Sequence, residues 1–385
     1  MHVDLAVVGT GLAGLSLARA ASGLSVALIG DAPAPMPAGG AFDTRVYAVT
    51  PGNAEFLDGL GAWRRLPRDR VAPVYAMRVF GDDGRAELAF DAYRAGVPAL
   101  AWIAEDAALQ AALYAALGQD ERVQRLVPER LARLQLEPDA ARLELAGGRV
   151  LRARLVAGAD GARSVVREQA GIGVRRTAYG QRGVVANFRC ERAHRGTAYQ
   201  WFRGGAVLAL LPLPGEQVSM VWSVADDEAE RLLALGPDAL AGEVGAACGQ
   251  VLGELRLVGA ARAYPLQRMA AERTVAARVA LLGDAAHVIH PLAGQGANLG
   301  LQDARQLAQV LAAREPGRDA GDERLLRRYA RARAGEVWAM DATVHGLYRL
   351  FASRARPVAA LRNAGLNLAG RLPVLKDLLM RQAMT

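Results

Sequence analysis

Gly9-Thr10-Gly11-Leu12-Ala13-Gly14 connects an apolar, β-branched run at residues 5–8 to a helical pattern at residues 12–21. A second apolar run follows at residues 24–29, so the three segments predict a βαβ unit. Glycines at such a turn let the backbone approach a pyrophosphate at the N-terminus of a helix. The motif therefore predicts nucleotide binding, although a glycine-rich helix start that serves only close packing would give the same pattern.

Two further glycine-rich turns follow predicted strands. Residues 158–167 follow the apolar run 150–156 and offer backbone N–H groups and two arginines to phosphates. Gly283-Asp284 follows the run 279–282 and leads to the stretch 290–298, His-Pro-Leu-Ala-Gly-Gln-Gly-Ala-Asn. A helix that begins near Asn298 would point free N–H groups and its positive end at the occupant of this turn, which suits an anionic ring.

The middle of the chain has a different composition. Between residues 184 and 224, β-branched and aromatic segments alternate with Gly and Pro, which is typical of an antiparallel sheet. The α/β pattern returns after Tyr264-Pro265-Leu266. We therefore predict an α/β fold in which a Rossmann-like nucleotide-binding domain contains an inserted β-rich substrate domain and ends in a helical C-terminus. The predicted division is 1–70, 98–178 and 268–345 for the first domain, 71–97 and 179–267 for the second, and 346–385 for the C-terminal segment.

Composition excludes several classes of protein. With 385 residues, 52% of them apolar and 22% charged, the chain can bury a large core and is not a disordered or fibrous protein. Two cysteines, Cys190 and Cys248, are too few for a disulfide scaffold, so the cytoplasm is the expected compartment. Lys376 is the only lysine and lies outside any glycine-rich loop, which excludes a P-loop.

Charge and metal ligands allow two further interpretations. The formal net charge is +8, and residues 347–385 carry seven basic residues against Asp377 alone, together with apolar residues at helical spacing. This segment would suit an anionic surface, or it packs on the protein with a solvated basic face.

Asp284, His287 and His290 have the residue types of a metal site, but no second cluster of carboxylates completes one, so we predict no metal.

The three glycine-rich motifs, in this order and spacing, resemble those of flavoprotein aromatic hydroxylases of the para-hydroxybenzoate hydroxylase type. Phe42-Asp43-Thr44-Arg45, Tyr179-Gly180-Gln181 and Tyr264-Pro265-Leu266 are similar to segments of the ubiquinone-biosynthesis branch, and the resemblance runs nearly end to end. It implies bound FAD, transient use of NAD(P)H as electron donor, and transfer of one oxygen atom from O2 to the ring of a polyprenylated phenol or quinone precursor. The cofactor supplies this chemistry, and the protein supplies orientation and exclusion of water.

The resemblance also implies roles for individual residues. Gly9, Gly11 and Gly14 would hold the FAD pyrophosphate, Arg45 would reach the FAD from its loop, and Asp284 would bind near the ribityl chain. Asp160 and Gly161 would serve both FAD and the nicotinamide nucleotide. The flavin ring would be bordered by Pro291, Gly294, Gln295, Gly296, Ala297 and Asn298.

Two positions depart from the family pattern. Gly30 stands where an acidic residue is expected to contact the ribose, so that contact either moves to Asp31 or is weakened. Asp106 stands where the family usually places Asn or Gln near the flavin, which leaves that contact in doubt.

The sequence says less about the residues that would bind the substrate. Trp201, Phe202, Leu211 and Trp222 offer apolar surface for a substrate, although each would serve equally in the core. Candidates to deprotonate the phenol are Tyr47, His287 and His290, which the sequence does not rank. Only one strand–glycine turn–helix unit of the first kind is present, so we expect no separate nicotinamide domain and only transient docking near 160–167.

The resemblance leaves other partners and functions open. A hydroxylase of another small aromatic compound and a non-catalytic flavoprotein scaffold among other quinone-biosynthesis proteins are the alternatives. We expect no nucleic acid as a partner. A peripheral contact with the inner membrane is the expectation attached to residues 347–385, and the oligomeric state is not predicted.

Overall fold

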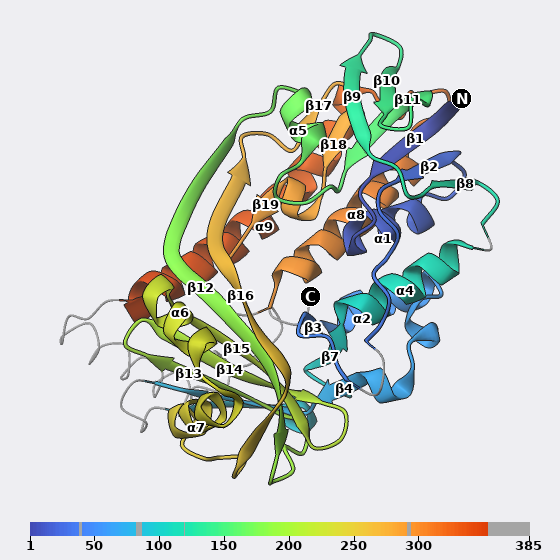
Figure 1. Cartoon of the computed structure of the whole chain (residues 1–385). Helices are drawn as coiled ribbons and strands as arrows, with labels where there is room; N and C mark the ends of the chain where they lie inside the picture. The colour runs from blue at the N-terminus through green and yellow to red at the C-terminus, as the bar shows by residue number, and fades with distance from the viewer. Residues whose placement is uncertain (38–40, 82–86, 119, 291–293, 353–385) are drawn as a thin grey trace.

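The first sheet is parallel at its centre and carries the glycine-rich turns at strand ends (Figure 1). The computed structural model describes residues 1–37, 41–81, 87–118, 120–290 and 294–352. The sheet has the order β17 (Val275–Ala276), β18 (Val279–Leu281), β11 (Val150–Gly158), β1 (His2–Val8), β2 (Val26–Ile29) and β8 (Val123–Leu126). The strands from β18 to β8 are parallel, which confirms the predicted βαβ unit.

Side chains of the first sheet alternate between two cores. Leu5 and Val7 point to one face, which is covered by α1 (Leu12–Ala20), α2 (Pro51–Gly59), α4 (Asp106–Leu117) and α8 (Gly296–Ala312). Val3, Ala6 and Val8 point to the other face, where β9 (Leu131–Leu136), β10 (Ala141–Leu145) and α5 (Val165–Gln169) pack. Burial on both faces explains why the strand sequences are continuous apolar runs.

The second sheet is mainly antiparallel. Its order is β19 (His287–Val288), β16 (Leu255–Ala271), β12 (Val174–Cys190), β15 (Gln217–Ala225), β14 (Ala206–Leu213), β13 (Thr197–Arg203), β5 (Ala76–Phe80) and β6 (Glu87–Asp91). Helices α6 (Asp226–Ala234) and α7 (Pro237–Ala247) cover one face of this sheet. The β-rich insertion expected from the composition of residues 184–224 is therefore present.

Strands β12 and β16 pair along most of their 17 residues each and join the two sheets (Figure 1). Strand β16 continues through Tyr264-Pro265-Leu266 to Ala271, and the α/β pattern that we expected after this segment returns with β18, which is parallel to β11. Most side chains of β16 are exposed or half-buried, so the strand lacks the apolar alternation by which sequence analysis recognises a strand.

A small third sheet is formed by strands between residues 46 and 105. It consists of β3 (Val46–Val49), β7 (Ala101–Glu105) and β4 (Val71–Val74), and short helical turns follow at 63–65, 68–70 and α3 (Ala92–Ala95). Of the segment 71–97, which we assigned to the β-rich domain, β5 and β6 join the second sheet whereas β4 pairs with β7. The domain boundaries themselves stay a prediction.

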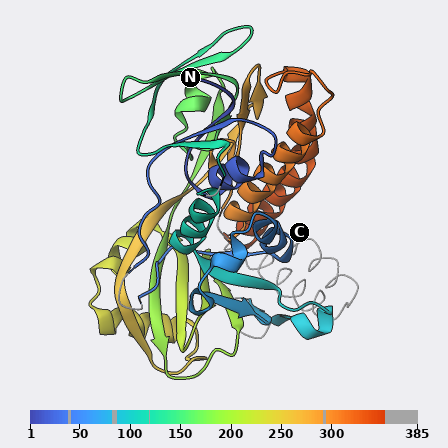
Figure 2. The ribbon, with the colours of Figure 1, turned by 90° about the vertical axis from the view of Figure 1, so that its right-hand side faces the viewer.

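Helix α9 (Glu323–Ala352) forms the helical C-terminus of the described chain and packs beside α8 (Figure 2). Tyr329 Oη donates to the carbonyl of Leu281, and Arg268 on β16 pairs with Asp341 at 2.8 Å. Most of the predicted segment 346–385 lies outside the described residues. None of the helices that the structure describes is long and apolar enough to cross a membrane.

A buried ionic network ties α9 to α8 and to the turn after β18. Asp303 on α8 lies 2.7 Å from His287 Nε2, and its other oxygen accepts from Arg333 Nε on α9, also at 2.7 Å. The Gly283 N–H donates to the same carboxylate at 2.9 Å. Burial opposes the charged imidazole, but Asp303 outweighs it and raises the pKa of His287. Burial likewise opposes the carboxylate, yet His287 and Arg333 lower the pKa of Asp303.

Asp303→Asn should destabilise the protein strongly, because it removes the buried counterion that Arg333 and His287 share and leaves Arg333 only the largely exposed Glu336. Loss of one member of a buried ion pair costs about 3–5 kcal/mol in the free energy of unfolding. Glu323→Gln is the matched control, since Glu323 pairs with Arg327 on the exposed face of α9, where such a pair is worth less than about 1 kcal/mol. Urea unfolding of both variants measures the difference, and equal losses would contradict this role of Asp303.

Candidate functional site

The three glycine-rich turns meet at one edge of the first sheet. Strands β18, β11 and β1 are parallel neighbours, so their carboxyl ends share this edge, where α/β proteins bind ligands. A Cβ atom on Gly9, whose φ is +118°, would lie 2.1 Å from the carbonyl oxygen of Ala159. A Cβ on Gly283 would lie 3.5 Å from both Ala13 Cβ and Gly300 Cα. Missing side chains thus allow the turns to touch.

The glycines of the first turn have different tasks. A Cβ on Gly14 would lie 2.0 Å from the carbonyl oxygen of Gly9, so Gly9 and Gly14 are required by the packing of the turn itself. A Cβ on Gly11 would have no atom within 4 Å, and α1 has neither a side-chain cap nor an acidic residue in its first turn. The positive end of α1 is therefore open to an anionic group that approaches Gly11.

The structure explains the departure at Gly30. A Cβ at this position would lie 2.7 Å from Thr10 Cγ2, and Thr10 Oγ1 donates to the backbone carbonyl of Asp31 at 2.7 Å. Thr10 therefore occupies the space that a side chain at position 30 would need. The Asp31 carboxylate is exposed and pairs with Arg130 at 3.1 Å, so a ribose contact through Asp31 stays a prediction.

In the second turn, the charged side chains build the turn itself. Asp160 accepts from Ser164 Oγ at 2.5 Å and from the Val166 N–H at 3.1 Å. Arg167 is buried and donates to the carbonyls of Ala285 and Ala162. The expectation that Arg167 offers its guanidinium to phosphates is therefore wrong.

Two parts of the second turn are accessible to a ligand: the backbone at Gly161 and the side chain of Arg163. Gly161 has φ +80°, and a Cβ on it would have no atom within 4 Å. Arg163 is exposed. A ligand that approaches this turn therefore meets the backbone at Gly161 and the side chain of Arg163.

Asp284 presents a carboxylate at the third turn. Its side chain is exposed, yet the protein atoms around it desolvate the carboxyl group and raise its pKa, against the opposing charges of His287 and Arg45. Asp284 thus presents an exposed carboxylate at this turn, where it can accept hydrogen bonds from a ligand.

The start of α8 is anchored by Asn298. Its Oδ1 accepts from the Thr50 N–H and from Asn53 Nδ2, and its Nδ2 donates to the Ala48 carbonyl at 2.8 Å. The Asn298 side chain is therefore engaged with protein, and its contribution to a ligand is to position the helix end.

The rest of the α8 start is open. A Cβ on Gly296 would have no atom within 4 Å, and the first turn of α8 contains no acidic residue. Gln295 and Ala297 flank it and are half-buried, and Gly294, at φ +63°, approaches Ala48. Pro291 lies outside the described residues.

A second buried network holds the loop before β3. Glu105 accepts from the Asp43 N–H at 2.6 Å and pairs with Arg70 at 3.2 Å. Asn187 on β12 donates from Nδ2 to the carbonyls of Phe42 and Asp43. Burial raises the pKa of Glu105, while the Asp43 N–H and Arg70 oppose the rise. The loop is thus fixed from two sides, by the small third sheet and by the second sheet.

Arg45 extends from this loop and is half-exposed. Its Nη1 lies 3.4 Å from Asp106 Oδ2, and its guanidinium lies over the ring of Tyr264. Asp106 also accepts from Gln110 Nε2 at 2.7 Å. The acid at position 106 therefore has a counterion in Arg45, which explains how a carboxylate is tolerated where an amide was expected.

The second sheet divides the four predicted substrate-facing residues into two pairs. Trp201 and Trp222 lie with α6 and α7, and Trp201 stacks on Phe80 and Tyr199, so they belong to the core on that face. Phe202 packs with Ile289 and Leu299, and Leu211 packs near Phe42 and Ala48. Of the four, only Phe202 therefore packs toward the start of α8, and only Leu211 packs toward the third sheet.

The three candidates for phenol deprotonation differ in their surroundings. His287 is engaged with Asp303 in the network described above and serves as a structural link. Burial raises the pKa of Tyr47, so its hydroxyl stays protonated at neutral pH. His290 is buried and belongs to neither network.

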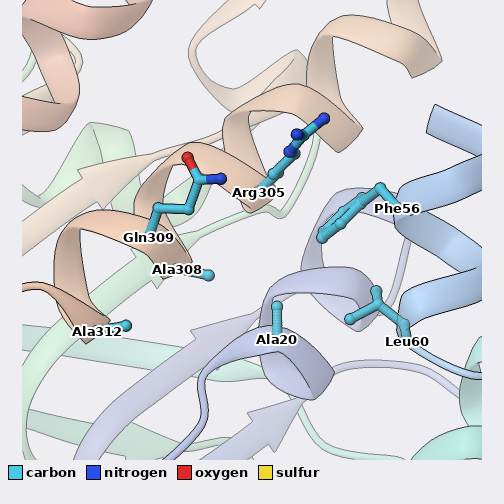
Figure 3. A pocket seen from close by; sticks show the side chains of 7 residues that line it. All are labelled: Ala20, Phe56, Leu60, Arg305, Ala308, Gln309 and Ala312. Carbon is cyan, nitrogen blue, oxygen red and sulfur yellow. The ribbon is translucent and has the colours of Figure 1, made fainter. Parts of the chain in front are cut away.

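A shallow recess lies away from the three turns. Figure 3 shows this recess of about 270 Å³, lined by Ala20, Phe56, Leu60 and the side chains of Arg305, Ala308, Gln309 and Ala312 on α8. Arg305 lies nine residues, or about 13 Å, along α8 from Gly296. This recess is therefore separate from the turns. Among the described residues, no three His, Cys, Asp or Glu side chains are placed to hold a metal ion.

Several supporting residues were not found from the sequence. Asp303, Glu105 and Asn187 hold the turns and the Arg45 loop through long-range contacts that no local spacing encodes. Arg333 lies on α9, and the sequence did not indicate its role. A polar residue within an apolar helical face, as at Asp303, is the one signal available.

Comparison with known proteins identifies the family. The family model described as FAD binding domain matches residues 2–343. A ubiquinone hydroxylase, UbiL, of Rhodospirillum rubrum is 38% identical, with 99% of this chain and 89% of the relative covered. The 3-demethoxyubiquinol 3-hydroxylase of Escherichia coli is 36% identical over 99% of this chain and 98% of its own. The crystal structure of p-nitrophenol 4-monooxygenase from Pseudomonas putida shares the fold, with TM-score 0.79 at 19% identity, covering 100% and 98% of the two chains.

The chain belongs to this family of FAD-binding proteins. It is an FAD-dependent monooxygenase, and the resemblance noted from the sequence is confirmed. The residues present fit the cofactor, because two helix N-termini without acidic residues and the open backbone at Gly11, Gly161 and Gly296 suit a pyrophosphate and an anionic ring.

Gly11→Ala should weaken FAD binding without destabilising the fold, whereas Gly14→Ala should destabilise the fold. The added methyl at Gly11 meets no protein atom but occupies the approach to α1, so we expect FAD affinity to fall roughly tenfold or more, which is about 1.4 kcal/mol. The methyl at Gly14 meets a carbonyl oxygen at 2.0 Å and should destabilise the fold by about 3 kcal/mol. Fluorescence titration with FAD and melting of the apoproteins measure both effects. Equal changes in FAD affinity and in melting temperature for the two variants would contradict the assignment of Gly11 to cofactor binding and Gly14 to packing.

Proposed function

We propose that the protein hydroxylates the aromatic ring of a polyprenylated phenol or quinone precursor in ubiquinone biosynthesis. The observation that carries this proposal is similarity over 99% of the chain to relatives whose names state ubiquinone or ubiquinol hydroxylation, at 36–38% identity. The apolar flavin-side surface of the second sheet, with Phe202 and Leu211, suits a substrate with a prenyl tail. NAD(P)H would serve as a transient electron donor, and O2 would supply the oxygen atom.

The cofactor would be held by the open backbone and the charged side chains of the three turns. In this proposal the pyrophosphate lies at Gly11 and the start of α1, beside Gly161 and the backbone at Asp160. Asp284 accepts from hydroxyl groups of the cofactor, and Arg45 contacts it from the loop. When bound, FAD supplies the redox chemistry with NAD(P)H and O2.

The flavin ring would lie against the N-terminus of α8. Gly294, Gln295 and Gly296 border this position, and the helix dipole stabilises negative charge there by up to about 2 kcal/mol. Asn298 fixes the position of the helix end through Ala48 and Thr50. The protein's own contribution is therefore to orient the ring, exclude water and stabilise negative charge.

Deletion of the gene in its host should cause a precursor that lacks one ring hydroxyl to accumulate. Mass spectrometry of the quinone fraction measures this, and the mass and fragmentation of the precursor identify the position. Wild-type protein should restore the quinone, whereas Asp284→Ala should not, because a lost charge-assisted hydrogen bond to FAD costs roughly 1.5–3 kcal/mol. An unchanged quinone profile in the deletion strain would overturn the proposed substrate.

We also propose a peripheral contact between α9 and an anionic membrane, from which an apolar substrate would be collected. Trp338 is 72% exposed on α9. Arg331 and Arg349 are exposed and lie seven and eleven residues from it, which places all three on one face of the helix. Tryptophan favours the membrane interface, and each basic residue near an anionic surface contributes about 1 kcal/mol. The larger part of the basic segment 347–385 lies outside the described residues.

Co-sedimentation with phosphatidylglycerol vesicles tests this contact. The wild-type protein should pellet at low salt and less at high salt, because salt screens the attraction. Trp338→Ala and Arg331→Glu should reduce pelleting several-fold, while Tyr93→Ala, which removes an aromatic side chain that is 93% exposed on α3, should not. Wild-type protein that stays in the supernatant at low salt would end the membrane proposal.

A further inference from the structure

His290 is a buried imidazole without hydrogen-bond partners. The residue is 1% exposed, and neither Nδ1 nor Nε2 has a partner among the residues that the structure describes. Burying a polar group without a partner costs about 1–3 kcal/mol. The unpaired imidazole therefore lowers the stability of the ligand-free protein. A ligand that forms a hydrogen bond with it would remove this cost.

Aromatic rings hold the imidazole in place. The ring of Tyr348 on α9 stacks on His290 with centroids 5.1 Å apart, and the ring of Tyr179 on β12 lies 4.8 Å away at 75°. The Tyr179 hydroxyl lies 3.3 Å from His345 Nδ1, so it is engaged with that residue. One face of the imidazole is thus covered by Tyr348, and its two nitrogens lie on the ring edge.

The position of His290 links it to the site. It follows β19 and precedes Gly294, on the loop that leads to the start of α8. Its neighbour Ile289 packs with Leu299 in the first turn of α8 and with Phe202, and Tyr348 packs against the same cluster. Phe202 is on the face of the second sheet that we assigned to the substrate. His290 therefore lies among residues that connect this face to α8.

The protonation state of His290 suits hydrogen bonding rather than acid–base catalysis. Burial, with a smaller effect of His345, lowers the pKa of His290 to about 4. The imidazole is therefore neutral at neutral pH and offers one N–H donor and one acceptor nitrogen. A hydroxyl group on an aromatic ring can use both properties, since it donates and accepts.

We propose that His290 recognises the substrate by a hydrogen bond to the hydroxyl oxygen of its aromatic ring. The inference deepens the proposed function and rests on it, because it assumes a phenolic substrate bound beside Phe202. In this arrangement the rings of Tyr179 and Tyr348, which are inclined at 61° to each other, hold the imidazole in place, and His290 is the polar group that distinguishes a phenol from the same ring without its hydroxyl. A site built to hydrogen-bond a hydroxyl rejects the analogue that lacks it, because the buried polar group is then left unpaired.

The test compares two ligands that differ by one hydroxyl. FAD-loaded wild-type protein is titrated with 2-geranylphenol and with geranylbenzene, and binding is followed by the visible absorbance of the flavin. We expect wild-type protein to prefer the phenol by roughly tenfold or more, and His290→Phe, which keeps a ring and removes both nitrogens, to reduce this preference to about one. Tyr179→Phe is the matched control, because Tyr179 packs against the same imidazole. This variant should keep the preference for the phenol. A preference that survives in His290→Phe, or that is absent from wild-type protein, would overturn the inference.

Melting of the ligand-free proteins gives an independent readout. An apolar group in place of an unpartnered imidazole should leave the melting temperature unchanged or raised. If His290→Phe does not fold, His290→Leu is used for both measurements. A clear drop in melting temperature for His290→Leu would show that the imidazole has a structural partner, and would overturn the proposal.

Titration with 2-methylphenol separates this inference from the proposed function. If 2-methylphenol binds as well as 2-geranylphenol, and His290→Phe still loses the hydroxyl preference, the prenylated substrate class fails while the role of His290 stands. If the geranyl group improves binding and His290→Phe keeps the hydroxyl preference, the role of His290 fails while the substrate class stands.

Discussion

Close backbone contact at Gly9 is the constraint on which the site depends. The carbonyl of Ala159 occupies the position where a side chain at Gly9 would lie, and Gly283 has φ +53°, a backbone conformation that favours glycine. These glycines allow three turns from distant parts of the chain to reach one sheet edge. The open positions at Gly11, Gly161 and Gly296 follow from the same packing. The chemistry of the bound cofactor thus depends on contacts that contain no functional group at all.

Much of the fold could be predicted because the first sheet is buried on both faces. Its strands are apolar runs, each followed by a glycine-rich turn, so β1, β11 and β18 and their turns were identifiable from local sequence. Strand β16 was not, since its mostly exposed residues show no apolar alternation. For the site, the backbone positions were predictable by motif, whereas the tasks of Asp160, Arg167 and Asn298 were not. Their side chains bind to protein atoms, which becomes visible only when distant carbonyl and amide groups are placed beside them.

The two departures from the family pattern have physical explanations of the same kind. Gly30 is required because Thr10 takes the space of a side chain, and the carboxylate at Asp106 is balanced by Arg45. Each unusual residue is thus matched by a neighbour that is remote in the sequence. A motif comparison judges positions one at a time and therefore reports such a pair as a deviation. In the structure, each unusual residue is compatible with its neighbour in space or charge.

The carboxylate of Asp303 connects the C-terminal helix to the turn at which we propose the cofactor binds. It contacts Arg333 on α9 and, through Gly283, the turn that carries Asp284. By thermodynamic linkage, any free energy by which the docking of α9 strengthens cofactor binding equals the free energy by which the cofactor strengthens the docking of α9. Cofactor retention would therefore report a disturbance of α9 that reaches Asp303. An event at the exposed face of that helix, such as contact with a surface or a proteolytic cut, has a direct route to the redox centre.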